Sequence, residues 1–181
     1  MIMAPGLRKL ALTAHVTSSI GWFGAVAAFL ALALVGLTSQ DAQLARAFSL
    51  AMELITRFVI VPLAFASLLT GIVSSLGTKW GLFRYYWVLL KLLITVLATL
   101  ILLVHTQPIE RLADTAAKGW LLGADVYQDQ LQMVVAATAA LVALLTLTAL
   151  SVYKPRGMTP YGQRNQQEQS TSVAVEDALT N

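Results

Sequence analysis

The sequence predicts an all-α polytopic membrane protein, a bundle of four transmembrane helices with a short outer surface helix. Of its 181 residues, 57% are apolar and 12% charged, and the mean hydropathy is +0.72. Soluble domains average about 45–50% apolar and 25% charged residues. Cysteine is absent and histidine occurs twice, which excludes disulfides, thiolate zinc sites, iron–sulfur clusters and CxxCH haem attachment. Four runs are long and apolar enough to cross a hydrocarbon core of about 30 Å.

The first predicted span covers residues 10–37, with no charge between Lys9 and Asp41. Arg8 and Lys9 precede it, as basic residues precede the apolar region of a secretory signal. Its uncharged length exceeds the roughly 7–15 residues of such a region, so we expect the span to be retained.

The second predicted span covers residues 54–76, after a more polar approach. Pro62 lacks the backbone N–H that a helix interior needs, and proline is a common cause of helix kinks. We therefore expect this span to bend near Phe58.

The third predicted span covers residues 82–107, with Pro108 as its stop, and the fourth covers residues 131–153. Pro108 also suits the first position of a new helix. Four apolar residues then share one helical face: Ile109, Leu112, Ala113 and Ala116. We expect a short helix that lies on the outer membrane surface.

The composition changes abruptly after the fourth span. Residues 154–181 are rich in Pro, Gly, Gln, Asn and Ser and have few large apolar side chains, so they cannot bury enough surface to fold alone. The chain is therefore predicted to consist of a four-helix transmembrane domain, residues 1–153, and a disordered cytoplasmic tail, residues 154–181.

Four spans place both termini on one side, and an excess of Lys and Arg marks the cytoplasmic side. The terminal side carries seven basic residues: Arg8, Lys9, Lys79, Arg84, Lys154, Arg156 and Arg164. The other side carries four: Arg46, Arg57, Arg111 and Lys118. We expect a multi-pass protein of the bacterial inner membrane with both termini cytoplasmic. The basic residues are scattered among apolar runs and form no patch, so nucleic acid is not an expected partner.

Small residues let helices approach closely in lipid. They recur every three or four positions in the first span at Ala14, Ser18, Gly21, Ala25 and Ala28. The second span has a similar stripe at Ala64, Ser67, Gly71 and Ser74. We predict that these two stripes face each other.

Ionisable residues inside a span are costly and often functional, so both histidines are candidate ligands of a haem or a metal. His15 lies near the cytoplasmic boundary, and His105 lies 14 residues after Lys91, toward the outer face. Their axial offset is at least about 12 Å, which disfavours a b-type haem held by both. Single-histidine ligation remains open, with Trp22 on the same face as His15. The alternative is a structural, hydrogen-bonded histidine.

Copper is the second candidate cofactor. Cu(I) favours thioether, thiolate and imidazole donors, and Met52 and Met133 lie at outer depths comparable with that of His105. These three residues make an outer copper site one hypothesis. The alternative is that both methionines fill space in the core.

Three charged residues need an explanation within the spans. Glu53 and Arg57 are four residues apart, so they can neutralise each other as the second helix enters the membrane. They form either an entry point for a substrate or ion, or an interfacial cap, which is the favoured interpretation. Lys91 is predicted to extend its ammonium group toward the cytoplasmic headgroups.

Several short motifs stand out: His15-Val-Thr-Ser-Ser-Ile-Gly-Trp22-Phe-Gly24, Leu69-Thr70-Gly71, Trp80-Gly81 and Leu89-Leu90-Lys91-Leu92. Together they resemble the copper-resistance protein D family and related small bacterial membrane proteins of unknown function. The resemblance implies copper handling or a redox-related membrane function, with His15 as the candidate ligand. The chain departs from the family because it is shorter than the transport members. It also lacks a Met-rich segment and additional membrane histidines.

Three functions remain open on this evidence. The first is a metal- or haem-related membrane module, and the second is a non-catalytic interaction subunit with structural histidines. The third is a small oligomeric transporter whose path is lined by Glu53, Arg57 and His105. The HExxH, GxSxG and GxGxxG motifs are absent, so we do not expect an enzyme. The expected partners are the lipid bilayer and either further copies of the chain or another membrane protein.

Overall fold

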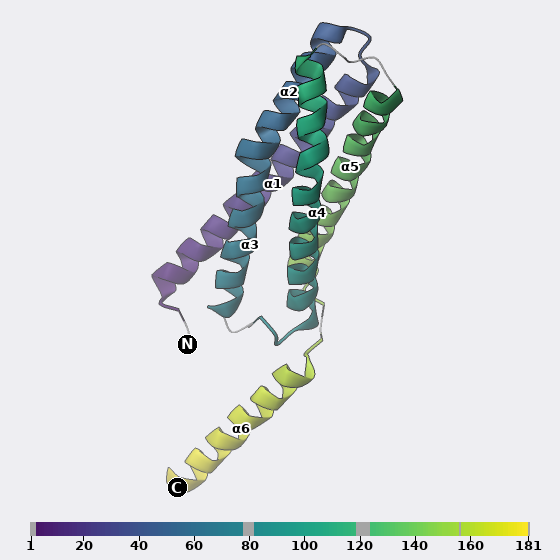
Figure 1. Cartoon of the computed structure of the whole chain (residues 1–181). Coiled ribbons are helices and arrows are strands. Elements are labelled where there is room, and N and C mark those ends of the chain that lie inside the picture. Colours follow the sequence, from purple (N-terminus) through teal and green to yellow (C-terminus); the bar gives the residue numbers. More distant parts are fainter. Residues whose placement is uncertain (1–2, 78–81, 119–123, 156, 181) are drawn as a thin grey trace.

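A computed structural model (Figure 1) describes residues 3–77, 82–118, 124–155 and 157–180. Trp80 and Gly81, which contribute to the family resemblance, lie outside these ranges. Four helical spans within the ranges are long and apolar enough to cross a membrane: Pro5–Thr38, Gln43–Leu76, Tyr86–Ala116 and Val126–Tyr153. The prediction of an all-α, four-helix fold is confirmed, and the chain is a multi-pass membrane protein.

Helix α1 (Pro5–Thr38) forms the first span, and α2 (Ala42–Ile55) begins the second. The connection between them is short, because α2 begins directly after Asp41, which caps its N-terminus. Its carboxylate accepts hydrogen bonds from the backbone N–H groups of Gln43, at 2.8 Å, and Leu44, at 3.4 Å. These are two of the N–H groups that a helix start leaves without a partner in the helix.

A π-helical turn, η1 (Thr56–Ile60), joins α2 to α3 (Val61–Leu76), so that the three elements make one continuous span. The N–H of Val61 donates to the carbonyl of Thr56, five residues back. In an α-helix the ring of Pro62 would crowd the carbonyl of Phe58. The irregularity predicted near Phe58 is therefore a wider turn.

Helix α4 (Tyr86–Ala117) passes through Pro108 without ending there. The predicted outer surface helix is instead the last part of α4, and its four apolar residues are buried: Ile109, Leu112, Ala113 and Ala116. These residues share one face, as predicted, but that face packs into the bundle and not onto the membrane surface. Proline is tolerated within membrane helices, and burial of this face favours continuation of the helix.

Helix α5 (Ala124–Tyr153) forms the fourth span. Lys154 follows it with a left-handed backbone, φ 42°, and its N–H donates to the carbonyl of Leu150 at 3.2 Å. This arrangement is a common way to end a helix.

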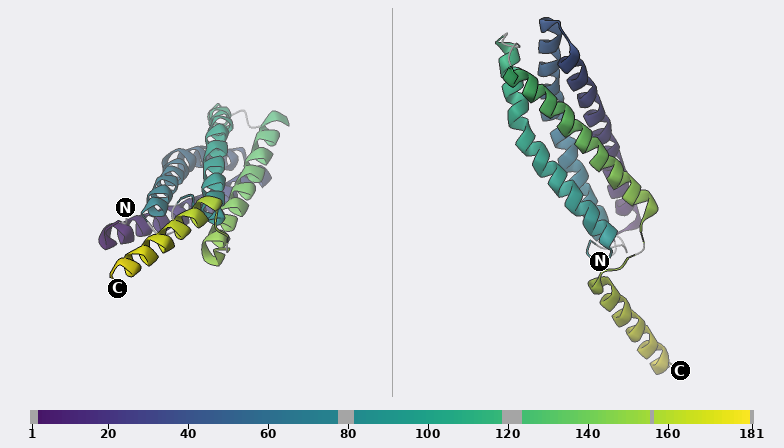
Figure 2. Two further views of the ribbon diagram at one scale, coloured as in Figure 1. Left: turned by 90° about the horizontal axis from the view of Figure 1, so that it is seen from below. Right: turned by 90° about the vertical axis from the view of Figure 1, so that its right-hand side faces the viewer.

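The views in Figures 1 and 2 define two ends of the bundle. The near end holds the start of α1, the end of α3, the start of α4 and the end of α5. The far end holds the α1–α2 connection, the end of α4 and the start of α5. Helices α1 and α4 each pack against α3 and α5, and each also contacts α2. The start of α1 and the end of α5 share one end, as an even number of crossings requires.

The predicted pairing of the first two spans is confirmed, because α1 packs closely against α3. Ser18, Ala64 and Ser67 are buried in the bundle. A Cβ on Gly21 would lie 3.2 Å from a methyl carbon of Leu63 on the other helix. Ala14 and Ala28 are exposed, so the small-residue stripe of α1 is buried only in part.

The exterior of the spans is apolar, as contact with lipid requires. On α4 the exposed side chains include Leu93 (65%), Leu97 (53%) and Leu100 (55%). The interior contains Trp22, Phe29 and Met133, which are 3%, 6% and 1% exposed.

Residues Pro160–Thr180 form helix α6, where the composition predicted no folded structure. This helix runs away from the near end of the bundle (Figures 1 and 2). Thr159 supplies its start: the threonine hydroxyl accepts from the N–H of Gly162 at 3.1 Å, and Pro160 occupies the first helical position. Both features favour a helix N-terminus.

Candidate functional site

Polar side chains from α1, α3, α4 and α5 gather in the near half of the bundle. We call this set the near-end cluster; it consists of His15, Ser67, Thr70, Ser74, Lys91 and Ser151. Its members come from spans that the sequence marks as apolar, so each polar group needs a partner or a function.

His15 links α1 to α3. Its Nδ1 lies 3.1 Å from the carbonyl oxygen of Ser67 and 3.3 Å from the hydroxyl of Thr70. A carbonyl oxygen only accepts hydrogen bonds, so the bond to Ser67 requires the proton on Nδ1. The neutral ring then carries its lone pair on Nε2.

Gly71 explains how the imidazole fits between the two helices. A Cβ at this position would lie 3.0 Å from Cε1 and 3.4 Å from Nδ1 of His15. The ring therefore packs directly on the backbone of α3. Beside it, the hydroxyls of Ser19 and Ser67 are 2.8 Å apart and form a second link between the same helices.

Lys91 links α4 to α5. Its ammonium group donates to the hydroxyl of Ser151 at 2.6 Å and lies 5.9 Å from the centre of the Trp87 ring. The Ser151 hydroxyl in turn donates to the carbonyl of Leu147. Lys91 is close enough to His15 for their charges to interact. The ammonium therefore bonds to a neighbouring helix, and its extension toward the headgroups stays a prediction.

A second near-end feature, which we call the clasp, joins residues 157–162 to residues 83–86. The Thr159 hydroxyl donates to the carbonyl of Phe83 at 2.6 Å, and the Thr159 N–H donates to the carbonyl of Arg84 at 3.0 Å. The N–H of Tyr86 donates to the carbonyl of Gly157. A Cβ on Gly162 would lie 2.5 Å from the Arg84 carbonyl oxygen, so only glycine fits there. The clasp fixes the root of α6 to the α3–α4 connection.

The proposed outer ligands lie in the far half of the bundle. His105 is half-buried on α4, and its Nδ1 lies 2.9 Å from the carbonyl oxygen of Ile101 on the same helix. Met52 and Met133 are 2% and 1% exposed and belong to the apolar core. The packing alternative thus describes the two methionines well, and His105 has a local hydrogen-bond partner.

The two histidines lie at different levels, as the residue counts predicted. Because α4 is one helix from Tyr86 to Ala117, His105 lies about 21 Å along it from Lys91. Lys91 lies on the His15 side of this separation, since the two side chains are close enough for their charges to interact. The separation disfavours one haem held by both rings. Trp22 is buried in the core cluster on the His15 face of α1.

Glu53 is half-buried and Arg57 is exposed. They form no ion pair within the part of the chain that the structure describes. Arg57 lies in the π turn η1, where bonds run to the fifth residue, so side chains four apart no longer stand directly above one another.

The described residues contain no group of three or more His, Cys, Asp or Glu side chains able to hold a metal ion. Compared with known proteins, the chain matches no protein-family model, no curated protein and no solved structure.

Sequence reasoning found His15 and Lys91 but missed Ser151 and Thr159. Ser151 is a polar residue in the last turn of an apolar span. Its polarity among apolar neighbours could have marked it as a candidate. Thr159 followed by Pro160 is a helix-start signature. Its partner Phe83 is 76 residues away, and no local pattern links them.

Proposed function

We propose that the protein is a non-catalytic membrane scaffold subunit that associates with further copies of itself through α6. In this proposal the four-helix bundle is the anchor, the near end faces the cytoplasm, and α6 is the interaction arm. The observation that carries the proposal is the clasp, because it gives a polar helix outside the bundle a fixed root.

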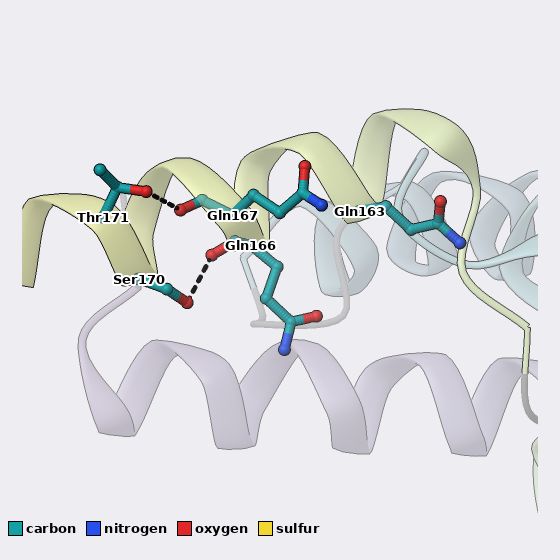
Figure 3. A pocket seen from close by; sticks show the side chains of 5 residues that line it. All are labelled: Gln163, Gln166, Gln167, Ser170 and Thr171. Atoms are coloured by element: carbon teal, nitrogen blue, oxygen red, sulfur yellow. Dashed lines mark hydrogen bonds between the residues drawn. The ribbon is translucent and has the colours of Figure 1, made fainter.

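One side of α6 favours a second copy as the partner. Five side chains follow one another at helical spacing and line a shallow depression of about 460 Å³ (Figure 3): Gln163, Gln166, Gln167, Ser170 and Thr171. All five are exposed and uncharged. Amide and hydroxyl groups both donate and accept hydrogen bonds, so such a stripe is complementary to itself across a two-fold axis. Most of the stability of protein helices comes from packing against other elements, and pairing would supply such packing to α6.

The proposal is tested by the oligomeric state of the purified full chain, measured by native mass spectrometry and by light scattering in detergent. Gln167→Glu places like charges opposite each other in the pair and is expected to convert dimers to monomers. Asn165→Asp makes the same chemical change on the opposite side of α6 and should leave the dimer intact. A wild-type chain that is monomeric at all accessible concentrations would refute self-association.

A second candidate function, metal or haem binding at His15, is favoured by one observation. The Ser67 carbonyl holds Nδ1, and metal-ligating histidines commonly donate their other ring N–H to such a group. The resemblance to copper-resistance proteins supports the same assignment. Metal analysis and a visible spectrum of the purified protein test it. Stoichiometric copper or a Soret band that disappears in His15→Ala would support this function over the scaffold. A colourless, metal-free protein would contradict it.

A further inference from the structure

The near end of the bundle contains a cation, Lys91, that has no carboxylate partner among the described residues. Lys91 lies in the second turn of α4, and within the same part of the chain its ammonium bonds to the neutral hydroxyl of Ser151. The chain has nine Asp and Glu residues. Six lie in the far half, from Asp41 to Asp129, and three lie on α6. None is on the near halves of the four spans that surround Lys91.

Other groups near Lys91 add positive charge. Lys154, directly after α5, is close enough for its charge to act on Lys91, and Lys91 acts in the same way on His15. A charged group in a membrane-spanning region is costly unless a counter-charge or water compensates it. Since the near halves of the spans supply no carboxylate, an anion from another molecule is one source of this compensation.

Two further features identify the kind of anion. The hydroxyl oxygen of Ser74, one turn nearer the end of α3 than Gly71, is buried and has no hydrogen-bond partner among the described residues. The Trp87 ring stands beside the ammonium, and indole rings favour the headgroup level of a membrane. Lysine is a common point-charge ligand of phosphate groups, and a hydroxyl can donate to a phosphate oxygen.

We propose that the near-end cluster binds a phosphate group, with the Lys91 ammonium as its main ligand and the Ser74 hydroxyl as a second donor. Ser151 holds the ammonium in place from α5, and Lys154 and Trp87 flank the site. The phosphate belongs either to the headgroup of an anionic phospholipid or to a soluble anion entering from the near side.

The full chain is tested in two arms that separate these sources. In the first arm, protein in a neutral detergent is titrated with inorganic phosphate, and chloride serves as the salt control. In the second arm, protein in phosphatidylcholine nanodiscs is compared with protein in nanodiscs that also contain phosphatidylglycerol. Thermal unfolding is measured in both arms, and native mass spectrometry counts the phosphatidylglycerol molecules that remain bound.

Lys91→Met removes the charge and keeps a long unbranched side chain. It should weaken phosphate or phosphatidylglycerol binding at least tenfold, whereas Lys91→Arg should retain most of the affinity. Lys9→Met is the matched control, because it removes an exposed cation from the same end of the bundle. Ser74→Ala should show a smaller loss than Lys91→Met.

Binding in the phosphate arm identifies a soluble anion, and binding in the nanodisc arm alone identifies a lipid headgroup. The proposal is overturned if the wild type responds to neither probe. It is equally overturned if Lys91→Met and Lys9→Met weaken binding to the same extent, because the effect would then be one of general surface charge.

Discussion

At the far end of the bundle the helices meet through buried apolar side chains such as Met52, Leu112 and Met133, which are 2%, 2% and 1% exposed. At the near end they meet through hydrogen bonds, from His15 to Ser67 and from Lys91 to Ser151. Apolar packing fixes shape and excludes other molecules. Hydrogen-bonding groups can exchange partners with water, headgroups or ligands. The far half is therefore built for rigid packing, and the near half holds the polar groups that are able to bind another molecule.

The largest effect on stability is expected in the far half. Leu112→Ala leaves a cavity in a fully packed region and should lower the free energy of unfolding by about 2–5 kcal/mol. Leu97→Ala on the same helix removes the same atoms from a side chain that is 53% exposed, and it should cost much less. Reversible unfolding in mixed detergent micelles measures both. Equal costs would show that the far half lacks the tight packing described above.

In the near half, Gly71→Ala should cost about 1–3 kcal/mol, because the new methyl group pushes against the His15 ring. Adding His15→Ala makes room for it, so the double variant should be more stable than the two separate costs predict. Gly24→Ala on α1 is the control, since nothing lies within 4 Å of its added Cβ. Thermal unfolding of the wild type, Gly71→Ala, His15→Ala and the double variant gives the coupling energy between the two positions. Strictly additive costs would contradict the contact between the ring and Gly71.

The clasp should respond locally and leave the bundle's stability almost unchanged. Gly162→Ala brings a methyl group against the Arg84 carbonyl oxygen and should release the root of α6. The expected readouts are faster hydrogen exchange at the Thr159 N–H and faster trypsin cleavage after Arg164. Gly157→Ala meets only Tyr86 at an ordinary 3.6 Å and should behave as the wild type. Identical exchange in both variants would argue that the root is not held by these contacts.

A small effect, confined to one helix, is expected at the far-end histidine. His105→Leu removes one hydrogen bond within its own helix and should change the free energy of unfolding by no more than about 0.5–1.5 kcal/mol. It should also leave the copper content of the purified protein unchanged. A loss of bound copper together with a large loss of stability would restore the outer site formed with Met52 and Met133.

The sequence predicted the spans because runs of apolar residues carry that information locally. It also paired α1 with α3, since the small residues of both helices repeat at helical spacing. It did not predict the passage of α4 through Pro108, because that outcome depends on the tertiary burial of Ile109 and Leu112. Nor did it predict the π turn before Pro62. That turn depends on how the helix adjusts to the backbone N–H that proline lacks.

The candidate site was predicted only in part. His15 and Lys91 stood out because charged or ionisable groups are rare in apolar spans. Their partners Ser67 and Ser151 lie 52 and 60 residues away. Serine also occurs often in membrane helices for packing reasons. The rotation and height of the packed helices decide which serine contacts His15 and which contacts Lys91. No single stretch of sequence contains that information.

The clasp also sets an order of events during synthesis. Phe83 leaves the ribosome 76 residues before its partner Thr159, and α4 and α5 lie between them. The contacts of Phe83 and Arg84 with Thr159 can therefore form only after the whole of the last span has been synthesised. A formed clasp thus marks a chain that has been made beyond its fourth span.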